Sequence, residues 1–178
     1  MTNRMWRNAA AILTCAALAH GANALDEFQR RIADYVKVHE QAQSSTGKLK
    51  PTTSAARIAD HEQELASRIR EAREGVVEGN IFTARTGKVF RRLLAHATGG
   101  RDATTVHQSL RRSEPVVVPL RVNEAYPERV PLQTTPPSVL QYLPKLPPQL
   151  EYRVVGRALV LRDTGANLIV DFLPNALP

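Results

Sequence analysis

Residues 150–172, with the sequence LEYRVVGRALVLRDTGANLIVDF, decide the fold of the C-terminal part of the chain. Apolar and polar residues alternate there with a period of two, which is typical of β-strands. Gly156 and Arg157 predict a two-residue hairpin turn that has glycine first, and residues 163–167 predict a second turn. The expected product is a three-stranded antiparallel meander, with strands at residues 152–155, 159–162 and 168–172.

Such a meander needs a further layer to cover one of its faces, and the upstream sequence supplies helices. Apolar residues repeat there at steps of three and four, and helices are expected at residues 25–43, 54–74, 81–97 and 102–112. Asn80 is predicted to cap the third helix. The short connection between the first two helices predicts an antiparallel hairpin. The apolar stripe of the second helix is expected to consist of Ile58, His61, Leu65, Ile69 and Ala72.

A proline-rich segment separates the helices from the strands. Nine of the twelve prolines lie between Pro115 and Pro148, and they limit the apolar runs there to extended structure or an edge strand. We expect an ordered belt that crosses the helices, with one turn of helix at residues 138–143. The predicted class is α+β in one domain, divided into a helical region at 25–112, the belt at 113–149 and the meander at 150–178.

The first 24 residues have the order of a secretory signal peptide. Arg4 and Arg7 form a basic start, residues 9–19 are uncharged and mostly apolar, and Ala22-Asn23-Ala24 gives a small-x-small cleavage pattern. We expect cleavage after Ala24 and export to the periplasm or the extracellular space. An uncleaved N-terminal anchor and a lipoprotein that uses Cys15 are the alternatives.

Charge and composition exclude several classes of function. The chain has 24 basic and 17 acidic residues, a net charge of +7. Loss of Arg4 and Arg7 leaves 22 basic residues and a net charge of +5, and the only cysteine, Cys15, leaves with them. A disulfide framework and a CxxC metal site are therefore excluded. Nucleic acid is not expected as a partner, because aromatic residues make up only 5% and no recognition motif is present.

The turn Asp163-Thr164-Gly165-Ala166 resembles the catalytic motif of retroviral-type aspartic proteases. Three departures disfavour that activity. Arg162 stands where the protease strand has an apolar residue. The apolar-apolar-Gly-Arg run that ends at Gly156-Arg157 resembles a second protease motif, but it precedes the Asp instead of following it, and too few residues follow Asp163 to form the rest of the protease barrel. A structural turn explains the same residues, since Asp and Thr bond to nearby backbone and Gly takes a positive φ. No catalytic residue and no cofactor are therefore predicted, with a hydrolase kept as a minor alternative.

Two histidines are the candidates for a metal site. His39 and His61 lie on the apolar stripes of their helices, each near the connecting loop, so an antiparallel hairpin would bring them together. His96, on the third helix, is a further member of this group. Histidines that pack by their rings, or that sense acid pH, are the other interpretations. His61-Glu62 begins like the zinc motif H-E-x-x-H, but Leu65 stands in place of the second histidine.

Basic residues gather on the helices, and Arg85, Lys88 and Arg92 share one face of the third helix, opposite its apolar face. A solvated helix surface is the simpler interpretation of these residues. Contact with an anionic membrane surface is the alternative.

Several stretches of the chain resemble a family of small secreted bacterial proteins that has no assigned activity. They are Phe28, residues 35–39, residues 79–82, residues 143–148 and residues 150–172, so that the likeness spans the chain after Ala24. The pattern from Leu150 to Asp171 is also similar to the terminal hairpin of small periplasmic proteins related to nickel and cobalt homeostasis. Both resemblances imply an exported protein.

The sequence therefore predicts a secreted or periplasmic, non-catalytic protein that interacts within the cell envelope or outside the cell. Its partner is unidentified, and another envelope protein is one candidate. The feature expected of such a protein is an exposed apolar groove, for example along the belt, without a convergent cluster of polar groups. A metal- or pH-responsive binding protein that uses His39 and His61 is the alternative, and a hydrolase is the less favoured one.

Overall fold

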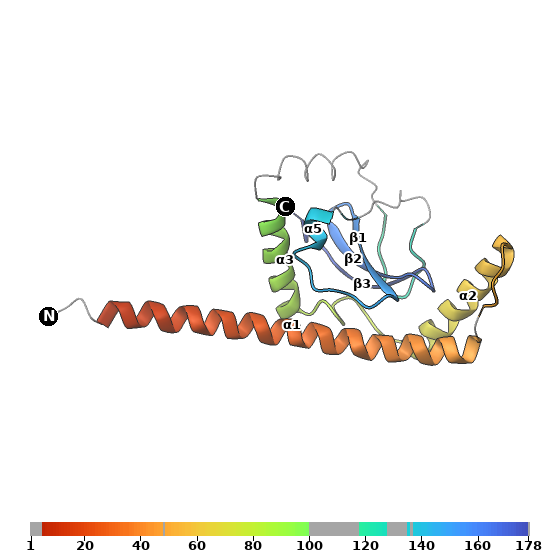
Figure 1. The fold of residues 1–178 in the computed structure, drawn as a ribbon, viewed down its shortest axis with the longest axis horizontal. Helices are drawn as coiled ribbons and strands as arrows, with labels where there is room; N and C mark the ends of the chain where they lie inside the picture. The colour runs from red at the N-terminus through yellow and green to blue at the C-terminus, as the bar shows by residue number, and fades with distance from the viewer. Residues whose placement is uncertain (1–4, 48, 100–117, 128–134, 136, 178) are drawn as a thin grey trace.

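The computed structural model describes residues 5–47, 49–99, 118–127, 135 and 137–177. It shows an α+β fold, as predicted, with helices in the N-terminal half and an antiparallel sheet at the C-terminus (Figure 1). Among the described residues, no helix is long and apolar enough to cross a membrane. The elements are α1 (Met5–Thr46), α2 (Ala55–Ala72), α3 (Ala84–Thr98), α5 (Pro137–Leu140), β1 (Leu150–Val155), β2 (Ala158–Asp163) and β3 (Leu168–Leu173).

The start of α3 differs from the prediction. Asn80 is not the N-cap, because the side chain of Thr83 accepts a hydrogen bond from the amide of Thr86 and the helix begins at Ala84. The amides of Ile81 and Phe82, which would have opened a helix at residue 81, instead donate to a carboxylate of the sheet. A tertiary contact therefore replaces the first turn of the predicted helix.

The first two helices are joined by a loop, as predicted, and α2 turns back to pack on α1 (Figure 1). Ser54 caps α2 by accepting from the amide of Arg57. The prediction that Ile58 and Ala72 belong to the buried stripe is wrong, because both are exposed and only Leu65 and Ile69 are buried apolar members of that stripe. The predicted helix at residues 102–112 lies outside the described residues.

The sheet is a meander in the order β1-β2-β3. Val155 pairs with Ala158, so Gly156 and Arg157 form the two-residue turn that the sequence predicts. Gly156 has a φ of 57°, and Arg157 is not among the residues with positive φ, which is the pattern of a type II′ turn. The pairing of β2 with β3 shifts register next to Leu161 and Arg162.

The helices cover one face of the sheet, and four aromatic rings connect the layers. The ring of Phe90 on α3 lies 4.7 Å from that of Phe28 on α1, 5.0 Å from that of Phe82, and 6.2 Å from that of Tyr152 on β1. Contacts of this kind add about 0.5–1.5 kcal/mol per pair beyond burial alone. The main core therefore links α1, α3 and β1 through side chains.

The opposite face of the sheet is covered by part of the proline-rich segment. Tyr126 packs there with side chains of all three strands, and the partly buried Leu120 and Val122 pack against them. Ala125 forms a bridge with Leu168, at the free edge of β3. Residues 113–117, 128–134 and 136 lie outside the described part of the chain, so a continuous belt remains a prediction.

Candidate functional site

A buried polar cluster joins the end of β2 to α1. Asp163 is completely buried, and its two carboxylate oxygens accept four hydrogen bonds. Oδ1 accepts from the amides of Gly165 at 2.9 Å and Ala166 at 2.8 Å. Oδ2 accepts from the Tyr35 hydroxyl at 2.7 Å and lies 2.6 Å from Nδ1 of His39. Since an ionised carboxylate only accepts, Nδ1 of His39 carries the proton in this pair.

Burial and hydrogen bonding act in opposite directions on this carboxyl group. Burial by itself raises the pKa of Asp163, but the hydrogen bonds from His39 and Tyr35 outweigh it and hold that pKa below its usual range. Burial raises the pKa of Tyr35 far above its ordinary value, and the neighbouring charge of Asp163 adds to this. Tyr35 therefore stays a neutral donor and Asp163 stays an ionised acceptor at neutral pH.

Arg73, at the end of α2, is the cation of this cluster. It lies 4.9 Å from the centre of the Tyr35 ring and donates to the carbonyl of Val170 at 2.9 Å. Burial lowers its pKa, while the neighbouring Tyr35 hydroxyl and the charges of Asp171 and Asp163 oppose that shift. One guanidinium nitrogen, Nη1, is buried without a hydrogen-bond partner, which makes Arg73 the least satisfied member of the cluster.

Asp171 on β3 is a second completely buried carboxylate. Its oxygens accept from the backbone amides of Gly79 at 3.0 Å, Ile81 at 2.6 Å, Phe82 at 2.8 Å and Phe172 at 2.9 Å. The loop before α3 thus folds its amides around one side chain of the sheet. Since the four hydrogen-bond donors to Asp171 are backbone amides, this side chain holds the loop in place rather than offering a reactive group.

The arrangement of Asp163 has the bonding of a structural turn, as the sequence predicts. Its Oδ1 caps the two following amides, and all its acceptor positions are occupied, which leaves no oxygen directed at a substrate. Two details of the prediction are wrong. Gly165 is not among the residues with positive φ, and the residue of this turn that takes that conformation is Asn167, with a φ of 50°. The Thr164 hydroxyl donates to the carbonyl of Gln149 rather than to its own turn.

Gly165 packs closely against α1 and α2, and its backbone is not among those with positive φ. A Cβ atom at this position would lie 3.3 Å from Cε1 of His39 and 3.5 Å from Cδ2 of Leu65. The turn packs closely on α1 and α2 at this position, so that an added methyl group would have to displace the His39 ring slightly.

The predicted metal candidates have separate partners. His39 is buried and bonds to Asp163, whereas His61 is partly buried and its Nε2 lies 3.3 Å from Nε2 of Gln43. His96 is exposed, and its ring meets the ring of Tyr142 edge-on. In the described part of the chain, no group of three or more His, Cys, Asp or Glu is placed to hold a metal ion.

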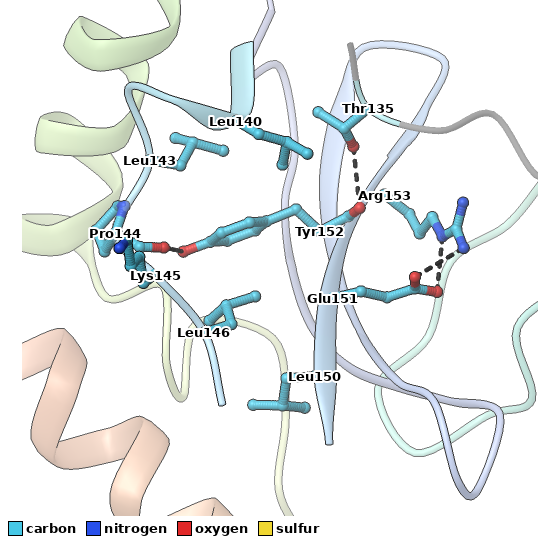
Figure 2. A pocket seen from close by; sticks show the side chains of 10 residues that line it. All are labelled: Thr135, Leu140, Leu143, Pro144, Lys145, Leu146, Leu150, Glu151, Tyr152 and Arg153. Atoms are coloured by element: carbon cyan, nitrogen blue, oxygen red, sulfur yellow. Dashed lines mark hydrogen bonds and ion pairs between the residues drawn. The ribbon is translucent and has the colours of Figure 1, made fainter. Parts of the chain in front are cut away.

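A pocket of about 410 Å³ lies between β1 and the segment that follows α5. Figure 2 shows the Tyr152 ring extending from β1 toward Pro144, with leucine side chains on both sides of it. The size falls within the range of sites for small organic ligands. The lining residues are Thr135, Leu140, Leu143, Pro144, Lys145, Leu146, Leu150, Glu151, Tyr152 and Arg153.

Most polar groups of the pocket already have partners. The Tyr152 hydroxyl donates to the carbonyl of Pro144 at 3.0 Å, and the Thr135 hydroxyl donates to that of Tyr152 at 2.9 Å. Glu151 binds Arg153 through both oxygens, and the pair points away from the Tyr152 ring (Figure 2). Lys145 is exposed and makes no ion pair with a described residue.

The carboxylate of Glu151 is held by the two arginines Arg153 and Arg162. Burial opposes its ionisation, but hydrogen bonds from Arg153 and Arg162 lower the pKa of Glu151 below its ordinary value. Arg162 reaches Glu151 across the sheet at 2.6 Å. A carboxylate held by two arginines is a weak base, so the pocket offers apolar walls and the cation of Lys145 rather than an acid–base pair.

Comparison of the chain with protein-family models, with curated proteins and with solved structures finds no match. The resemblances described above therefore stay predictions. The sequence predicts an apolar groove along the proline-rich segment for an interaction protein, but it does not identify these residues as the lining of a pocket. The sequence pattern that could have indicated them is the row of leucines at 140, 143, 146 and 150, which lies among and just after the prolines.

Proposed function

We propose that this protein is an exported, non-catalytic binding protein of the cell envelope. The signal-peptide pattern before Leu25 supports export. The observation that carries the binding role is the apolar pocket of about 410 Å³ beside β1. The two buried carboxylates, Asp163 and Asp171, have every contact directed inward, which supports a structural rather than a catalytic role for them.

The chemistry of the pocket favours an amphiphile with an anionic headgroup. Four leucines, Pro144 and the Tyr152 ring offer apolar contact, and the hydroxyl groups inside are already bonded to carbonyl oxygens. A ligand part with its own donors or acceptors would lose hydration there without replacement. Lys145 at the pocket adds a cation that attracts a carboxylate or phosphate. The ligand that we propose is therefore an acyl chain with an anionic end.

Titration calorimetry with sodium dodecanoate, kept below its micelle concentration, tests this proposal on the full chain. Dodecanoate is expected to bind more tightly than dodecyltrimethylammonium, which has the same chain and the opposite charge. Leu140→Gln is expected to weaken dodecanoate binding about fivefold, because it removes about 1 kcal/mol of apolar contact. Lys145→Gln is expected to remove the preference for the anionic headgroup.

Val77→Gln is the matched control, because Val77 is a 72% exposed aliphatic residue outside the lining of the pocket. It should bind dodecanoate like the original chain. Absence of dodecanoate binding, or equal binding by Leu140→Gln and Val77→Gln, would overturn the proposal. Binding of an apolar peptide in preference to dodecanoate would show that a side chain of another envelope protein occupies the pocket instead.

A further inference from the structure

The exposed side of α3 carries a row of cations. Arg85, Lys88 and Arg92 are exposed, and none of them makes an ion pair with a described residue. The helix itself contains no Asp or Glu. At 3.6 residues per turn, these three positions and His96 fall within about 80° of the helix circumference. The positive charges therefore form one continuous stripe, which we call the cationic row.

An exposed apolar pair lies at the end of this row. The ring of His96, one turn beyond Arg92, meets the ring of Tyr142 edge-on with 5.3 Å between centres. Tyr142 is 39% exposed and Leu140 is 41% exposed, and Figure 1 shows α5 beside α3. Cations beside an exposed aromatic and an exposed aliphatic side chain are the composition of a surface that lies at a membrane interface.

We propose that the cationic row, together with Leu140 and Tyr142, docks the protein on an anionic lipid membrane. Charge complementarity argues for this occupant, because lipid phosphates neutralise three unpaired cations while Tyr142 and Leu140 enter the headgroup region. The proposal does not depend on a ligand in the pocket. Tyr142 is not among the pocket residues, so its contribution separates membrane docking from ligand binding.

Co-sedimentation of the full chain with vesicles tests this docking. The measured quantity is the ratio of affinities for vesicles with 30% phosphatidylglycerol in phosphatidylcholine and for pure phosphatidylcholine vesicles. The N-terminal apolar run is common to all variants, so it does not affect comparisons between them. The triple substitution Arg85→Gln, Lys88→Gln and Arg92→Gln is expected to lower the ratio about 100-fold, since each cation near such a surface contributes about fivefold.

The matched control removes three other exposed cations, with the substitutions Arg30→Gln, Lys50→Gln and Arg57→Gln. These lie on α1, in the loop and on α2, so this variant changes net charge equally and is expected to lower the ratio less than fivefold. The double substitution Arg85→Lys and Arg92→Lys should retain the ratio, and Tyr142→Ser should lower the affinity for both kinds of vesicle. Equal ratios for the two glutamine variants would overturn the proposal, as would equally strong binding to a DNA duplex through the same three cations.

Discussion

The carboxylate of Asp163 is the most connected polar group that joins the helices to the sheet, and Asp163→Asn tests whether it is a structural link. The substitution keeps the size and shape of the side chain. It leaves an oxygen for the amides of Gly165 and Ala166, which lie 2.9 and 2.8 Å from Oδ1 in the original chain. It places an NH₂ group at the position of Oδ2, which accepts hydrogen bonds from the Tyr35 hydroxyl and from Nδ1 of His39.

The expected loss follows from those two contacts. A hydrogen bond to a charged group contributes about 1.5–3 kcal/mol, against about 1 kcal/mol for a neutral one. The Tyr35 hydroxyl can rotate to accept from the new NH₂ group, and the His39 ring can accept only after it loses its Nδ1 proton. Replacing two charged contacts by two neutral ones therefore costs about 1–4 kcal/mol in the free energy of unfolding.

Urea unfolding followed by circular dichroism measures this loss, and its pH dependence is diagnostic. The folded-state pKa of Asp163 is lowered, so its contribution to stability is complete above the unfolded-state value of about 3.9. That contribution falls as pH drops below this value toward the folded-state pKa. The difference between the original chain and Asp163→Asn should therefore be constant from pH 7 to pH 5 and shrink in stronger acid.

Asp34→Asn provides the control for this measurement. Asp34 also contacts its partner on α1 by an ion pair, with Lys37 at 3.0 Å, but its side chain is 70% exposed. The same chemical change there should alter the unfolding free energy by less than about 0.5 kcal/mol. An Asp163→Asn loss no larger than that of Asp34→Asn would refute the reasoning, as would a loss that does not shrink below pH 4.

Two further substitutions test the packing around the buried carboxylates. Asp171→Asn should cost about 2–4 kcal/mol in urea unfolding, because one of its oxygens, which accepts from the amides of Ile81 and Phe82, becomes a donor that faces other donors. An unchanged unfolding midpoint would contradict this. Gly165→Ala should cost about 1–3 kcal/mol, since the new methyl group would press on His39. If overpacking is the cause, Gly165→Ala combined with His39→Ala should show a smaller loss than the sum of the two single losses.

The meander could be predicted from the sequence because its signals are local. Period-two alternation, the Gly156-Arg157 turn and the five-residue turn after Arg162 specify the strands without help from the rest of the chain. The start of α3 could not be predicted in this way. Its first turn depends on Asp171, about ninety residues later, which binds the amides that Asn80 was expected to cap.

The roles of the polar residues depend on the same kind of distant contact. His39 stood out as a histidine on an apolar stripe, and Asp163 stood out within a turn motif, but their pairing spans 124 residues. Tyr35 lies one turn before His39 on the same stripe, and its hydroxyl is the third member of the cluster. Periodicity shows that these side chains face inward, whereas only the folded sheet shows which one they meet.

The side chains that stabilise the fold and the side chains that we propose for recognition are different residues. Asp163 connects α1 to the sheet and Asp171 connects the loop before α3 to it, and both carboxylates are completely buried. The exposed features to which we assign recognition are Lys145, the cationic row and the exposed pair Leu140 and Tyr142. Substitution of the buried acids should therefore remove function only through loss of folded protein. Loss of binding in a chain of unchanged stability should come from this surface.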